Sequence, residues 1–123
     1  MRERKPVARA LTTAERERYE PYFAPRVIEA ARIIDGRVPF WLRRDMCGVT
    51  IGSRIYLRRG AYDANSAAGI ELLAHELAHV QQYADGMTVL AYLWASRRGY
   101  RRNPFEVEAY ALGARVRAET RVG

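Results

Sequence analysis

Several residue types are scarce in this sequence of 123 residues, and each scarcity limits what the protein can be. The single cysteine, Cys47, excludes an internal disulfide. The longest apolar run, residues 87 to 95, is too short to span a bilayer. The basic start of the chain leads into no apolar signal region. We therefore expect a cytoplasmic protein without a membrane segment.

Lysine is scarce as well: apart from Lys5 the basic residues are all arginines, and the net charge is +7. The arginines are spread along the chain with glutamates between them, which favours a solvated surface over a nucleic-acid partner. A denser cluster at residues 97 to 102 fits either a phosphate site or a solvated helix end. Length and composition predict one globular domain, residues 1–123, with a flexible arm at 1–11.

Histidine is equally rare, and both histidines belong to one H-E-x-x-H pattern, His75-Glu76-Leu77-Ala78-His79. On a helix, residues four apart project from one face, so both histidines can bind one metal ion. Glu76 lies to the side of that face, where it can act as a general base on a water molecule. Core histidines would share the helix's apolar stripe, which lies roughly opposite and comprises Ile70, Leu73, Leu77, Val80 and Ala84. The pattern therefore predicts a zinc site.

Capping and turn residues predict the remaining elements. The expected helices run from Thr13 to Glu20, from Pro25 through Ile34 to a stop at Gly36, from a cap at Asn65 or Ser66 to about Ala84, from Thr88 to Arg98, and onward from the cap Asn103. Residues 38–42 contain a proline and suit an edge strand or the wall of a pocket. Residues 47–57 predict a hairpin around a Gly-Ser turn. We expect an α+β fold of four to five helices, with a small antiparallel hairpin or three-stranded sheet beside the motif helix.

A catalytic zinc site usually has three protein ligands, so two histidines leave one ligand to be found. The candidates are Cys47 and the acidic residues Glu106 and Glu108 of the last helix. Glu106 occupies the third helical position, where it could instead complete a capping box with Asn103. Glu108 points about 200° away from Glu106, so the two cannot both bind the same ion. The residues alone leave the choice open.

The H-E-L-A-H motif followed by a helix bearing E-x-x-A resembles the gluzincin class of zinc metallopeptidases. Residues 38 to 83 also resemble a bacterial metallopeptidase-like domain often found in proteins associated with contractile injection systems. The resemblance implies a zincin-like fold and a zinc ion held by His75, His79 and Glu106, with Glu76 as the catalytic base. It favours Glu106 over Glu108 as the third ligand.

The resemblance also suggests roles for residues around the metal. Gluzincins commonly carry an aspartate four residues after the ligand glutamate; here that residue is Tyr110, whose hydroxyl could accept the imidazole proton. Tyr100 is a second candidate for supporting the ligands or the transition state. An exposed strand beside the motif helix would pair with the substrate, and the candidates for that strand are Val49, Ile51, Ile55 and Leu57. The predicted function is cleavage of a peptide or protein substrate; the alternative is a zinc-binding interaction module without turnover.

Overall fold

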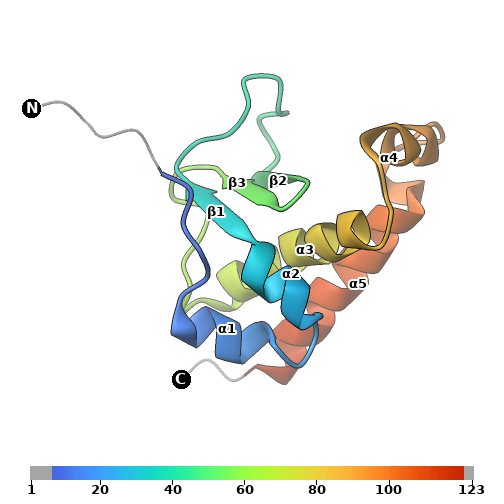
Figure 1. The fold of residues 1–123 in the computed structure, drawn as a ribbon. Coiled ribbons are helices and arrows are strands. Elements are labelled where there is room, and N and C mark those ends of the chain that lie inside the picture. The colour runs from blue at the N-terminus through green and yellow to red at the C-terminus, as the bar shows by residue number, and fades with distance from the viewer. Residues whose placement is uncertain (1–6, 121–123) are drawn as a thin grey trace, which may run out of the picture.

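The computed structural model describes residues 7–120 and has the expected α+β fold (Figure 1). Within the described residues it contains five α-helices, one short 3-10 helix and a three-stranded sheet. The elements are α1 (Thr13–Tyr19), α2 (Pro25–Ala30), β1 (Arg32–Asp35), β2 (Gly48–Ile51), β3 (Arg54–Leu57), α3 (Ala67–Ala84), α4 (Val89–Ala95), η1 (Tyr100–Arg102) and α5 (Pro104–Glu119).

The segment before α1 belongs to the folded domain. Arg9 forms a backbone bridge with Ile33, and Leu11 is buried in the core. The prediction of a flexible arm is therefore wrong for residues 9 to 11, and residues 1–6 lie outside the described part. The capping box of α1 is confirmed, since the Thr12 and Glu15 side chains each bond the other's backbone amide.

The second helix is shorter than predicted and is followed by a strand. Val27, Ile28, Ala31 and Ile34 fit helical spacing, yet α2 ends at Ala30 and residues 32–35 form β1. β1 pairs in parallel with β3, and Ile33 is also bonded to Arg9 on the other side. Long-range pairing of a β-branched segment outweighs the local helical pattern here.

The predicted hairpin is confirmed as β2 and β3, joined at Gly52, whose φ of 64° suits a tight two-residue turn. The sheet order is β1-β3-β2, so β3 is bonded to a strand on both sides. Ile55 and Leu57 lie on β3 and are fully buried, so their proposed pairing with a substrate is wrong. β2, which carries Val49 and Ile51, is an edge strand. Residues 38–42 form no strand.

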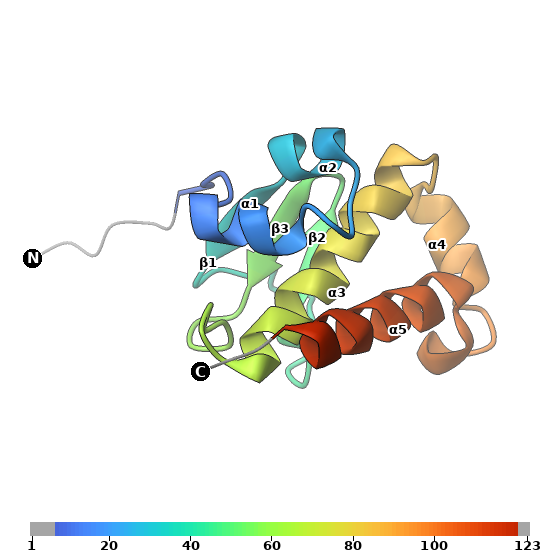
Figure 2. The same ribbon diagram turned by 90° about the horizontal axis from the view of Figure 1, so that it is seen from below.

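The motif helix α3 lies beneath the sheet, with α5 running beside it in the opposite direction (Figures 1 and 2). Ser66 caps α3, as one of the two predicted candidates. Four residues of the predicted stripe are buried, but Ala84 is exposed. Gly113 permits close approach of α5, because a Cβ there would lie 3.0 Å from the Glu71 carbonyl oxygen and 3.6 Å from the His75 Cβ.

The fourth helix lies at one end of the domain, beside the start of α5 (Figures 1 and 2). Thr88 caps it, but it ends at Ala95 rather than at the predicted Arg98. None of its residues is buried, although its sequence is entirely uncharged. Across residues 7–120, no helix is both long enough and apolar enough to cross a membrane.

Candidate metal centre

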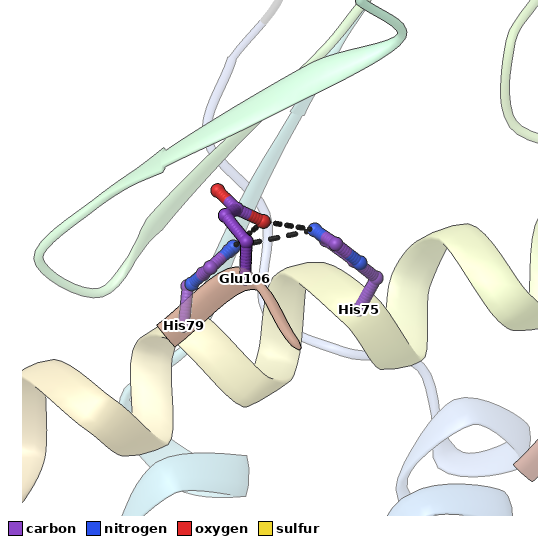
Figure 3. Close-up of side chains that lie close together, drawn as sticks. All are labelled: His75, His79 and Glu106. Carbon is purple, nitrogen blue, oxygen red and sulfur yellow. Dashed lines mark hydrogen bonds and ion pairs between the residues drawn. The ribbon is translucent and has the colours of Figure 1, made fainter. Parts of the chain in front are cut away.

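Three side chains from α3 and α5 converge on one point (Figure 3). His75 and His79 project from α3, one turn apart, and Glu106 projects from the first turn of α5. His75 Nε2 lies 3.3 Å from His79 Nε2, and Glu106 Oε1 lies 3.0 Å from the first nitrogen and 3.1 Å from the second. The pairing of α3 with α5 thus creates a triangle of three donor atoms.

The size of this triangle fits a zinc ion. Tetrahedral zinc with bonds of about 2.0–2.1 Å to nitrogen and oxygen separates neighbouring donors by roughly 3.3 Å. The observed separations of 3.0 to 3.3 Å are close to this value. Two imidazoles and one carboxylate are also a ligand set that catalytic zinc uses.

Gln82 fixes which nitrogen of His79 faces the triangle. The Gln82 amide nitrogen donates to the Phe105 carbonyl and to Glu108 Oε1, both at 2.9 Å, so its oxygen must face His79. That oxygen lies 2.8 Å from His79 Nδ1, which must therefore carry a proton. In the neutral imidazole, Nε2 then presents a lone pair toward the other two donors. Such an arrangement suits a metal ligand.

The third donor is Glu106 rather than the other candidates. Glu106 is buried, and its second carboxylate oxygen accepts a hydrogen bond from the Tyr92 hydroxyl. Its alternative capping role is not realised, because the Asn103 amide donates to the Tyr100 carbonyl. Glu108 is exposed and bonds Gln82, away from the histidine nitrogens. Cys47 is exposed and lies outside the donor triangle.

Glu106 and His79 shift each other's pKa. Burial alone would raise the pKa of Glu106, but hydrogen bonds from His75 and His79 outweigh it and hold that pKa well below its usual range. Burial would lower the pKa of His79, yet the Glu106 carboxylate raises it overall. Together the two shifts favour an anionic Glu106 beside a protonated His79 in the metal-free protein.

Glu76 lies beside the triangle and is buried. Thr50 from the edge strand β2 donates to the Glu76 backbone carbonyl at 3.1 Å and contacts its carboxylate at 3.4 Å. Burial raises the pKa of Glu76 above its ordinary value, although the nearby histidines oppose this shift. A buried carboxyl with a raised pKa is suited to accept and release a proton.

Tyr110 contacts His75 through its ring. The two ring centroids are 4.4 Å apart in an edge-to-face arrangement, while the Tyr110 hydroxyl is 3.1 Å from that of Tyr100. Gln82, and not Tyr110, accepts the imidazole proton of His79. Sequence reasoning missed Gln82 and Tyr92. Gln82 could have been found from its position three residues after His79, on the same side of the helix.

The triangle opens into a cleft of about 340 Å³. Val49 and Ile51 of β2 line one wall, and Trp41 and Leu42 of the preceding loop line another. The prediction that residues 38–42 form a pocket wall is thus confirmed for these two residues. Tyr100 also lines the cleft.

Fold and site together define a small α+β domain with a two-histidine, one-glutamate donor set on paired helices. Comparison with known families places the eCIS core domain over residues 10–87, which is more than half of the chain. The chain therefore belongs to the eCIS core domain family, in agreement with the expected association with contractile injection systems. The match includes both histidines and Glu76 and ends before Glu106. Searches of curated proteins and of solved structures gave no match.

Proposed function

We propose that this domain is a zinc-dependent peptidase of the gluzincin type. The observation that carries the proposal is the donor triangle of His75, His79 and Glu106, with Glu76 buried next to it. Zinc bound there would supply a Lewis acid that polarises a carbonyl group and lowers the pKa of water.

The chain's own residues account for the proton transfers. Glu76 Oε1 or Oε2 accepts a proton from the attacking water and delivers it to the nitrogen of the leaving amine. Thr50 holds this carboxylate in place from β2. A Cβ at Gly48 would lie 2.7 Å from the Tyr56 carbonyl oxygen and 3.7 Å from Glu76 Oε2. Glycine at this position therefore avoids a clash with β3 and leaves the space beside the Glu76 carboxylate free.

The free edge of β2 is a suitable guide for the substrate backbone. The Cys47 carbonyl accepts from the Arg58 amide, so residues 47, 49 and 51 direct their backbone groups toward β3. Gly48 and Thr50 therefore direct theirs toward the open edge, and within residues 7–120 the Thr50 carbonyl oxygen has one hydrogen-bond donor, the Tyr83 hydroxyl at 3.4 Å. An extended peptide can add to this edge as a further strand, with Val49 and Ile51 lining the cleft beside it.

Cleavage of an unfolded polypeptide by purified protein with and without zinc tests the proposal. Glu76→Gln should keep its zinc and lose roughly a hundredfold or more of the rate, because only the general base is removed. Glu71→Gln is the matched control, since it changes the same group five residues earlier on α3, where Glu71 pairs with Arg117. Full zinc occupancy without cleavage in the wild type would instead favour a zinc-binding module without turnover.

A further inference from the structure

A second hollow adjoins the metal cleft. It measures about 790 Å³, shares Arg43, Met46 and Tyr100 with the cleft, and is lined further by Arg98, Arg101 and Arg102. We call it the arginine basin. Because the two hollows have three wall residues in common, they lie side by side, and we call the cleft and the arginine basin together the groove.

The arginine basin carries positive charge that the described part of the protein leaves uncompensated. Its one carboxylate, Asp45, is paired with Arg43 at 2.9 Å. Arg98, Arg101 and Arg102 are exposed and have no carboxylate partner within residues 7–120. Three unpaired guanidinium groups around a hollow favour an anionic ligand, and their planar donors match carboxylates well.

Apart from the metal ligands and Glu76, the cleft end of the groove is lined mainly by apolar and aromatic residues. Leu93 of α4 and Trp41 line it, although each is 57% exposed. Leu90 of α4 is 78% exposed but does not line the cleft. Apolar side chains that line a hollow and remain exposed mark a binding surface.

We propose that the groove binds an extended polypeptide that places a large apolar side chain in the cleft and a neighbouring run of Asp or Glu residues in the arginine basin. This inference deepens the proposed peptidase function and rests on it for the role of the bound chain as substrate. Binding to a membrane surface favours a flat or convex basic face, whereas these arginines line a hollow. The open edge of β2 beside the cleft offers backbone hydrogen bonds in the pattern of an extended polypeptide, and together with the positive charge this favours an acidic polypeptide.

Binding is measured by fluorescence anisotropy with short labelled peptides that contain one phenylalanine and a run of glutamates before or after it. Matched peptides replace the glutamates with glutamines, or the phenylalanine with serine. Binding is followed both in chelator-treated wild type and in zinc-loaded Glu76→Gln, which prevents cleavage. Of the two acidic peptides, the one whose glutamates lie on the correct side of the phenylalanine should bind more tightly than its glutamine version. Added salt should weaken the binding of that acidic peptide and not of its glutamine version.

Two pairs of variants locate the contacts. The triple variant Arg98→Gln, Arg101→Gln, Arg102→Gln should weaken binding roughly tenfold, at about twofold for each exposed ion pair. Its control is Arg16→Gln, Arg26→Gln, Arg115→Gln, which removes the same charge from surface ion pairs on α1, α2 and late α5 and should leave the affinity within about twofold. Leu93→Ser should weaken binding of the phenylalanine peptide about threefold or more, while Leu90→Ser on the same helix should not.

Equal affinity for the acidic and glutamine peptides, or equal losses in the two triple variants, would overturn the proposal. Preference for a single-stranded oligonucleotide or for anionic vesicles over every acidic peptide would also overturn it. If the wild type retains no zinc but still binds the acidic peptide, the groove is supported and the metal site of the proposed function is refuted. Zinc binding and cleavage of neutral peptides alone would support the peptidase and refute the acidic preference.

Discussion

Replacing Gln82 with leucine isolates the side chain that orients a metal ligand. The variant removes the oxygen that lies 2.8 Å from His79 Nδ1, and leucine has a similar volume but no acceptor. His79 would then be free to carry its proton on Nε2, where it opposes metal binding. One buried hydrogen bond contributes about 1 kcal/mol, and losing the orientation of a histidine ligand typically lowers metal affinity by about 10- to 100-fold. We therefore expect a loss of about 1.4 to 2.7 kcal/mol in zinc binding.

The neighbouring glutamine provides the control. Gln81 accepts a hydrogen bond from the Ala24 amide at 3.0 Å and donates to Asp85, and neither contact involves the histidines. Gln81→Leu should lower the free energy of unfolding by about 1 kcal/mol and leave zinc affinity unchanged. Competition with a chromophoric chelator at fixed pH measures the affinity, and thermal unfolding shows that each variant is folded. Equal zinc affinity of the two leucine variants would refute the role assigned to Gln82.

Three further predictions concern carboxylates and their partners. Glu106→Gln should weaken zinc binding by orders of magnitude while Glu108→Gln changes it at most tenfold, and the reverse order in a chelator competition would show that the ligand is Glu108. Tyr92→Phe removes the hydroxyl that bonds Glu106, so zinc affinity should fall up to about tenfold; an unchanged value in the same assay would contradict this. For Glu15, burial opposes ionisation, but bonds from Arg9, Tyr62 and Thr12 lower its pKa from 4.5 to about 2. The folded protein should therefore lose stability as pH falls through that interval, by about 2 kcal/mol after allowance for solvent screening, and Glu15→Gln should remove this dependence in acid titrations followed by circular dichroism.

Local sequence signals predicted the elements that depend on neighbouring residues. The capping box at Thr12, the cap at Ser66, the turn at Gly52 and the start of α5 at Pro104 are all set within a few residues. β1 could not be predicted in this way, because its partners, Arg9 and β3, lie about twenty residues away on either side. The apolar spacing of residues 27 to 34 therefore indicated a helix that tertiary pairing overrides.

In the candidate site, too, some features follow from neighbouring residues and others depend on long-range packing. The one-turn spacing of His75 and His79 follows from the helix alone. The choice between Glu106 and Glu108 required the packing of α5 on α3, which depends on the close approach at Gly113. The contact of Tyr92 with Glu106 depends on how α4 is placed, and no short-range pattern predicts that placement.

X-ray absorption at the zinc edge, on protein loaded with one zinc ion per chain, tests the metal site most directly. The structure predicts two imidazole nitrogens and light oxygen donors at about 2.0–2.1 Å and no sulfur, because Cys47 lies outside the donor triangle. The same spectrum of His79→Ala should lose the signature of one imidazole or show unbound zinc. Failure of the wild type to retain zinc, or a sulfur shell at about 2.3 Å, would contradict the assignment of His75, His79 and Glu106 as the ligands.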